Sequence, residues 1–303
     1  MHAIITTGLG KTYPGGKEAL KDLSLQLDEG EVFGFLGPNG AGKTTAVKLL
    51  TGMLNPTAGS ALVMGHDPEK DPERVHALCG VVTENARMYD HLSGLENLMF
   101  YGALYGQNSF ESRERADMLL AGLALHDAKD KKLGAYSTGM RQKLSFARAL
   151  MHRPRMLFLD EPTSGMDPES GIKVNQMITR LAKEEGVTVF LCTHQLRYAQ
   201  DICTRFGLIS EGAMLMTGTL PELQNAVLPG IRVRIRADKL PAGLPLQEAG
   251  NGVFEGSLGE EGEVADLVRK IVLQGGDLYR VEVEKPSLEE IYFALTRNRE
   301  AAK

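Results

Sequence analysis

The segment Gly37–Thr44 has the residue types and spacing of a loop that binds phosphate groups. Its sequence, Gly-Pro-Asn-Gly-Ala-Gly-Lys-Thr, fits the pattern G-x-x-x-x-G-K-[ST]. Glycines in such a loop let backbone N–H groups converge on phosphate oxygens. Lys43 is therefore expected to reach the β- and γ-phosphates of a nucleotide, and the Thr44 hydroxyl to ligate Mg²⁺. The alternative is a glycine-rich tight turn, which would not require a strand before it and a helix after it.

A pair of carboxylates, Asp160 and Glu161, directly follows the apolar run Met156–Leu159. In an open α/β sheet, ligands bind outside the carboxyl ends of the strands, so these acids are expected at a ligand site. We expect Asp160 to hold Mg²⁺ through water. We expect Glu161 to orient and polarise an attacking water, as a general base does. The alternative is a pair of solvated acids at the start of a loop.

His194 follows a third apolar run, Val187–Cys192. A lone histidine at the end of a strand is usually a structural hydrogen-bonding group. Because this one would share a sheet edge with Asp160 and Glu161, contact with a γ-phosphate is the favoured role.

These residues need strands and helices to position them, and the apolar pattern predicts such elements. Continuously apolar runs are typical of strands buried on both faces, whereas alternation is typical of strands with one buried face. Strands that alternate with helices predict a mostly parallel sheet in an α/β fold. The predicted strands are Leu23–Leu27, Val32–Leu36, Met156–Leu159 and Val187–Cys192, and the predicted helices are Lys43–Thr51, much of Leu95–Leu125, Met140–Met151 and Pro168–Glu185.

The composition changes after about Asn225, where Pro and Gly clusters become frequent. We expect one domain over residues 1–224, with a helical subdomain at about 94–153. Residues 225–303 are expected to form a small accessory α/β domain. Its predicted elements are strands at Ile231–Arg236, Val253–Glu255 and Leu278–Val283 and helices at Glu263–Leu273 and Leu288–Leu295.

The composition and the apolar segments argue against several classes of protein. The 303 residues carry a net charge of −5, which gives no support to nucleic-acid binding. The three cysteines match no metal motif and are expected to be reduced thiols. No segment approaches the ~20 apolar residues of a membrane-spanning helix. The first residues lack the basic segment and the long apolar stretch of a signal peptide, so none is expected. Any action at a membrane is expected to need another chain.

Residues 3–220 resemble the ATP-binding subunits of ABC transporters, because the family's motifs occur in the family's order. Gly37–Thr45 resembles Walker A, Met156–Glu161 Walker B, Ser164–Asp167 the D-loop, and Thr193–His194 the H-loop. Tyr136–Met140 resembles the signature sequence, and Tyr13 matches the aromatic residue that stacks on adenine. The resemblance implies these nucleotide contacts: Tyr13, Gly37, Pro38, Asn39, Gly40, Ala41, Gly42, Lys43, Thr44, Thr45, Glu84, Ser137, Gly139, Asp160 and Asp167.

Two positions depart from the family pattern. The signature is Tyr-Ser-Thr-Gly-Met rather than Leu-Ser-Gly-Gly-Gln, although Ser137 and Gly139 are retained. Glu84 stands where the family usually has Gln, a residue that touches the metal shell and couples the site to the membrane subunit. Glu84 is therefore counted with Thr44 and Asp160 as a metal contact, and nearby Arg87 could offset its charge. Both departures resemble the ABC-2-type branch, which includes drug, antibiotic and sodium exporters.

The resemblance implies a P-loop NTPase, RecA-like core with an antiparallel β subdomain and a helical signature subdomain. It also implies that Lys43, Glu161 and His194 catalyse the hydrolysis of ATP to ADP and phosphate, with Mg²⁺. Two copies would sandwich ATP and drive a separately encoded permease from the cytoplasmic face of the membrane. The alternatives are a soluble ABC protein that remodels ribosomes or DNA, and a nucleotide-binding regulator that does not hydrolyse ATP.

Overall fold

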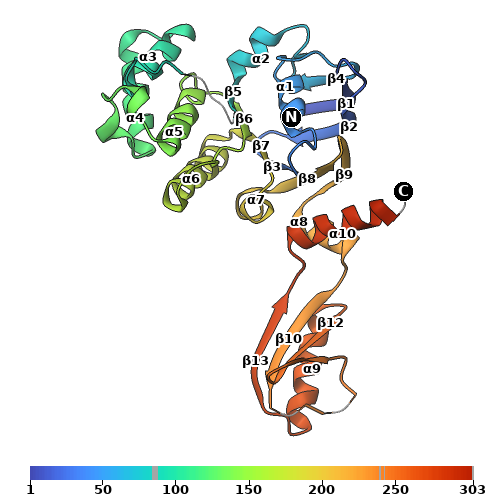
Figure 1. The fold of residues 1–303 in the computed structure, drawn as a ribbon. Coiled ribbons are helices and arrows are strands. Elements are labelled where there is room, and N and C mark those ends of the chain that lie inside the picture. Colours follow the sequence, from blue (N-terminus) through green and yellow to red (C-terminus); the bar gives the residue numbers. More distant parts are fainter. Residues whose placement is uncertain (84–87, 239, 242, 302–303) are drawn as a thin grey trace. The chain divides into compact units, whose positions relative to one another are not determined.

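The computed structural model describes residues 1–83, 88–238, 240–241 and 243–301. The chain divides into two compact units, Met1–Thr217 and Gly218–Lys303 (Figure 1). Each unit has its own sheet and its own hydrophobic core. Within the described ranges, no helix combines the length and the apolar character needed to cross a membrane.

The first unit is built on a nine-stranded sheet with the order β4-β1-β2-β9-β8-β3-β7-β6-β5. The strands β3, β5, β6, β7 and β8 pair in parallel, whereas β1 pairs antiparallel with β2 and β4. The prediction of an α/β fold with a largely parallel sheet is confirmed. The strands are β1 (His2–Thr12), β2 (Glu18–Asp28), β3 (Val32–Leu36), β4 (Ala58–Val63), β5 (Cys79–Val82), β6 (Met156–Asp160), β7 (Thr188–Thr193), β8 (Arg205–Ser210) and β9 (Ala213–Gly218).

The central strands β3, β6 and β7 are buried along their whole length because apolar layers cover both faces of the sheet. On one face the phenylalanines of these strands pack with α1 (Lys43–Leu50). On the other face Leu157, Leu159 and Leu191 pack with α6 (Pro168–Glu185) and with the helices of residues 94–149. The other helices are α2 (Pro72–Leu78), α3 (Gly94–Leu104), α4 (Ser109–Gly122), α5 (Thr138–Ala149) and α7 (Leu196–Ile202), with 3₁₀ turns at His126–Ala128 and Leu133–Ala135.

The second unit is a four-stranded sheet, in the order β11-β12-β10-β13, with one helix, α9, on one face. Neighbouring strands in this sheet pair antiparallel. The apolar residues of β10 alternate with exposed arginines, so the sheet has one covered face and one open face. The elements are α8 (Leu220–Val227), β10 (Ile231–Ala237), β11 (Gln247–Gly250), β12 (Val253–Leu258), α9 (Glu261–Leu273), β13 (Leu278–Glu284) and α10 (Leu288–Ala301).

The division between the units comes before α8, and the expected boundary at 224/225 falls inside that helix. The reason is packing, because α8 lies against α10 and the Gln224 side chain donates a hydrogen bond of 2.7 Å to the carbonyl of Pro286. Tyr13 directly follows β1, a strand that was not predicted from the sequence.

Candidate active site

The phosphate-binding loop lies between β3 and α1, where it forms a tight path that only glycine can follow. A Cβ atom on Gly37 would lie 2.2 Å from the carbonyl oxygen of Ile209, and one on Gly42 would lie 2.4 Å from that of Ala19. Gly42 is also the N-cap of α1 at φ 110°, and no side chain caps the helix. The first N–H groups of a helix have no partner within the helix, so this N-terminus favours an anion.

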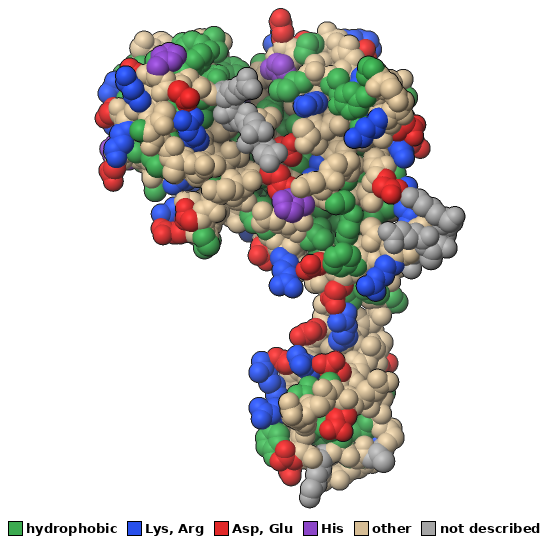
Figure 2. Space-filling view, in the orientation of Figure 1, with side chains coloured by type: hydrophobic (Ala, Val, Ile, Leu, Met, Phe, Trp, Pro, Cys, Tyr) green, Lys and Arg blue, Asp and Glu red, His purple; other side chains and the backbone are tan. Residues whose placement is uncertain are grey.

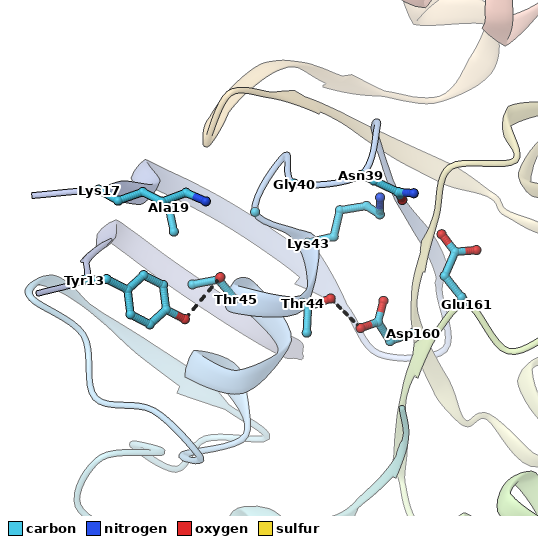
Figure 3. Close-up of a pocket in the computed structure, with 11 residues that line it drawn as sticks. Tyr13, Lys17, Ala19, Asn39, Gly40, Lys43, Thr44, Thr45, Asp160 and Glu161 are labelled. Atoms are coloured by element: carbon cyan, nitrogen blue, oxygen red, sulfur yellow. Dashed lines mark hydrogen bonds between the residues drawn. The ribbon is translucent and has the colours of Figure 1, made fainter. Parts of the chain in front are cut away.

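Lys43 and Thr44 are the first residues of α1, and their side chains point to the carboxyl ends of β3 and β6. The Lys43 ammonium is buried in the loop and donates hydrogen bonds to the carbonyls of Gly37 (2.7 Å) and Pro38 (3.1 Å). The Thr44 hydroxyl donates to Oδ2 of Asp160 at 2.7 Å, which joins α1 to the end of β6 (Figure 3).

A hydroxyl beside a carboxylate is a donor set that suits Mg²⁺, which prefers oxygen ligands. The described residues contain no group of three or more His, Cys, Asp or Glu side chains that could hold a metal. A magnesium ion bound by Thr44 and Asp160 would therefore complete its shell with phosphate oxygens and water, as this ion commonly does.

Glu161 is held in one orientation by the end of β7. Its Oε2 accepts a hydrogen bond from the Thr193 hydroxyl (2.8 Å), and its Oε1 accepts one from the His194 backbone N–H (2.9 Å). The ring Nδ1 of His194 lies 2.7 Å from the same Oε1. The backbone of Glu161 has φ +49°, a left-handed conformation that costs a non-glycine residue ~1 kcal/mol or more. The surrounding bonds hold this conformation, which directs the carboxylate into the cavity.

Tyr13 lies in the turn between β1 and β2, at the opposite end of the cavity from Glu161 (Figure 3). Its hydroxyl is 3.5 Å from the hydroxyl of Thr45, and the Lys11 ammonium lies 5.9 Å from the centre of its ring. The cavity thus runs from an aromatic ring, along the loop, to the carboxylates. Its lining residues are Tyr13, Lys17, Ala19, Asn39, Gly40, Gly42, Lys43, Thr44, Thr45, Asp160 and Glu161.

Two of these lining residues, Lys17 and Ala19, were not predicted from the sequence. Both lie just after Tyr13, whose N–H donates to the carbonyl of Lys17 at 2.9 Å. The turn signal Pro14-Gly15-Gly16 could have indicated that the chain reverses here and returns past the ring.

Ser137, Gly139 and Asp167 lie in the same unit but do not line this cavity. Ser137 is the N-cap of α5, where its hydroxyl accepts a hydrogen bond from the Met140 N–H at 3.3 Å. Asp167 caps α6 in the same manner, and the hydrogen bond from the Ser170 N–H lowers the pKa of its carboxyl below the usual value. Each residue therefore lies at a helix N-terminus, where N–H groups have no carbonyl partner within the helix.

The electrostatic surroundings of the loop also include Cys192, whose thiol lies 3.9 Å from the carbonyl of Lys43. Complete burial raises the pKa of this thiol well above its usual value, so it stays protonated and unreactive. Glu84 and Arg87, the departure from the family pattern and its suggested counter-charge, lie outside the described residues.

The chain is similar to proteins of one family. Residues 20–164 match a family model described as "ABC transporter". The chain is 40% identical to the daunorubicin/doxorubicin resistance ATP-binding protein DrrA of Streptomyces peucetius, over 74% of this chain and 68% of that protein. It is 30% identical to the linearmycin resistance ATP-binding protein LnrL of Bacillus subtilis, over 93% and 94% of the two chains.

Among solved structures, the first unit is similar to a dimeric, post-hydrolysis structure of the ATP-binding cassette MJ0796 with ADP and Pi. The two chains are 26% identical with a TM-score of 0.67, over 72% of this chain and 98% of the other.

Proposed function

This chain belongs to the ABC transporter family as an ATP-binding subunit and an ATPase, and we propose that it powers an ABC-2-type exporter by ATP-driven closure of two copies. The observation that carries the proposal is the convergence of Lys43, Thr44, Asp160 and Glu161 on one cavity that ends at Tyr13. The two relatives with drug-resistance names support export as the direction of transport.

We assign the steps of hydrolysis to the residues around the cavity. Lys43 and the N–H groups of α1 stabilise negative charge on the β- and γ-phosphates. Thr44 and Asp160 would hold Mg²⁺, which would supply positive charge to the phosphates. Glu161 accepts a proton from water as the water oxygen bonds to the γ-phosphorus and the bond to ADP breaks.

His194 has two tasks in this scheme. Its Nδ1 contacts Glu161 at 2.7 Å, which fixes the direction of the carboxylate. We assign the contact with the γ-phosphate to its other ring nitrogen, Nε2, because half of the side chain remains exposed.

A second copy of the chain completes the site in this proposal. The cavity-lining residues of the described chain include none from Tyr136–Met140, so its own signature segment does not contact a nucleotide held there. The N-terminus of α5, at Ser137 and Gly139, suits a γ-phosphate because its N–H groups and helix dipole favour an anion. We assign Asp167, at the N-terminus of α6, to the same contact between copies.

The partner at the membrane is a permease, which we place against the exposed aromatic side chains near α3. Tyr89 and Phe100 pack edge to face with ring centres 5.0 Å apart, and Leu104 and Tyr105 are also exposed. Exposed apolar groups gathered in this way are typical of a protein interface. The subunit would then work at the cytoplasmic face of the membrane, and Glu84, between β5 and α3, would couple the metal shell to the permease.

Mixing two inactive variants tests the shared site. Ser137→Arg is expected to block closure without preventing ATP binding, and Lys43→Ala is expected to abolish turnover. In a mixed dimer, one site has Lys43 from the first chain and an intact signature from the second. Phosphate release should therefore recover partially on mixing.

The reference for this experiment is each variant alone at the same total concentration. If the Ser137→Arg protein hydrolyses ATP at the rate of the parent, the shared-site proposal is wrong. ATP binding to Ser137→Arg, measured by equilibrium dialysis, is expected to match that of the parent, which separates blocked closure from misfolding.

A further inference from the structure

The two outer edges of the second unit's sheet differ in the length of their strands. An edge strand presents unpaired N–H and C=O groups, which makes it a template for another strand. At one edge, β11 has only four residues and its register with β12 is interrupted. At the other edge, β13 has seven residues and pairs with β10 on its inner side, with one register shift at Tyr279, and no other described strand pairs with it.

An edge of the first unit shows how this chain protects a strand that has no neighbour. Along β5, the carbonyl of Cys79 lies 3.2 Å from Nε2 of His152, and the carbonyl of Val81 accepts a hydrogen bond of 3.1 Å from Arg148. Side chains at the end of α5 thus occupy two acceptors of that edge. The described side chains include no comparable cover for β13.

Strand β13 has exposed apolar and charged side chains, which could contact the side chains of a second strand. Tyr279 and Val283 are exposed by 60% and 44%, which is high for large apolar residues in a strand. Arg280 and Glu282 lie on the open face of the sheet and form an ion pair of 2.5 Å. In Figure 2, acidic and basic side chains gather along the side of the unit where Figure 1 shows β13.

A second β13 strand would fit this edge in one register. Two identical antiparallel strands related by a two-fold axis overlap completely when the axis passes through Val281, the middle residue of Leu278–Glu284. Arg280 of each copy then lies opposite Glu282 of the other, and Val281 lies opposite its own copy. Opposite charges and apolar pairs in facing positions stabilise strand pairing.

The neighbouring symmetric registers each contain a like-charge pair. An axis through Glu282 would place that carboxylate opposite its own copy, although Arg280 would then face Glu284, and an axis through Arg280 would place the guanidinium opposite its own copy. Like charges directly opposite one another destabilise a strand pair. The register with the greatest overlap is therefore also the register with matched charges.

We propose that β13 is a self-association edge, through which two copies of this chain join antiparallel into one eight-stranded sheet. The contact uses backbone groups and side chains of the second unit alone, so it does not require nucleotide. It is separate from the ATP-dependent pairing assigned above to the first unit.

Charge reversal in the full-length, nucleotide-free protein tests the proposal. The association constant is measured by sedimentation velocity over a range of protein concentrations. Arg280→Glu and Glu282→Arg are each expected to weaken self-association about tenfold or more, because each places like charges opposite one another twice. Mixed together, the two variants should associate as the parent does, since each Glu then faces an Arg. The double variant carrying both changes should also recover.

Arg269→Glu is the matched control, because it makes the same charge change on α9, away from the edge, and should leave association unchanged. Recovery on mixing requires both variants to be folded, so it also excludes misfolding as the cause of the single effects. A parent protein that stays monomeric without nucleotide at all concentrations would overturn the proposal. So would single variants that associate normally, or a mixture that does not recover.

Discussion

Strand β7 in the first unit and strand β10 in the second are built from different sequence patterns and serve different purposes. All six residues of β7 are buried, because helices cover both faces of its sheet. In β10, Ile231, Val233, Ile235 and Ala237 are buried under α9, and the arginines between them are exposed. The number of layers around a strand is therefore visible in its sequence.

The difference also separates chemistry from recognition. In the first unit, strands covered on both faces end together. Residues after β3 and at the end of β6 line one cavity, and the end of β7 holds Glu161 there. In the second unit, the open face carries ion pairs such as Arg234 with Glu255 at 3.1 Å. Ion pairs exposed to solvent contribute little to the stability of the fold. A buried strand end can fix a reactive group in place, whereas an open face or edge can meet a partner.

The largest expected effect belongs to the end of β6. Glu161→Gln keeps the size of the side chain and removes the base, so we expect hydrolysis to fall ~10²-fold or more while ATP binding survives. An ATP-bound dimer should accumulate, because closure no longer leads to hydrolysis. Phosphate release and the ATP retained by the dimer in sedimentation are the measurements.

Glu73→Gln is the control for that change, since it alters an exposed acid in the first turn of α2. Its rate should stay within about twofold of the parent. An unchanged rate in Glu161→Gln would mean that the base lies elsewhere. The end of β6 would then matter no more for hydrolysis than an exposed position on α2.

The parallel core was predictable because its strands are short, continuous apolar runs. Val32–Leu36 and Pro168–Glu185 are predicted to the residue, and β6 extends one residue beyond its prediction. Strand β1 was not predicted. Its sequence contains Thr and Gly and few large apolar residues. It becomes a strand by pairing with β4, which is distant in the sequence, and with β2, to which its register is irregular.

Parts of the site were predictable for the same reason. Thr44 lies in the helix after β3 and Asp160 at the end of β6, so their meeting could be expected from the order of strands and helices. The orientation of Glu161 could not, since it depends on a left-handed backbone and on hydrogen bonds from Thr193 and His194. Lys17 was missed because only the reversal of the chain after Tyr13 brings it to the cavity.

A smaller effect is expected at the far end of the cavity, where a ring replaces charge as the binding group. Tyr13→Ala should raise the KM for ATP by ~5- to 150-fold, by analogy with the ~1–3 kcal/mol of a base stacked on an aromatic ring. The kcat should stay within about twofold, because the reacting groups are untouched. ATP and GTP should become more alike as substrates.

Tyr13→Phe separates the ring from the hydroxyl, which lies 3.5 Å from Thr45. We expect this variant to keep the KM of the parent within about twofold. An unchanged preference for ATP over GTP in Tyr13→Ala would count against stacking, even if the KM rises.

The smallest effects test the alternation of β10 directly. Ile235 is fully buried under α9, so Ile235→Val removes one methyl group from the core and should lower the opening free energy of the second unit by ~0.5–1.5 kcal/mol. Arg236 lies on the open face, and no ion pair involving it is found among the described residues. Arg236→Gln should therefore change the same quantity by less than ~0.5 kcal/mol.

Amide hydrogen exchange in β10 measures both values, because units of a protein open with separate free energies. Protection in β7 should stay unchanged in both variants, since its core belongs to the first unit. Equal losses at the two positions would show that β10 is covered on both faces, as β7 is.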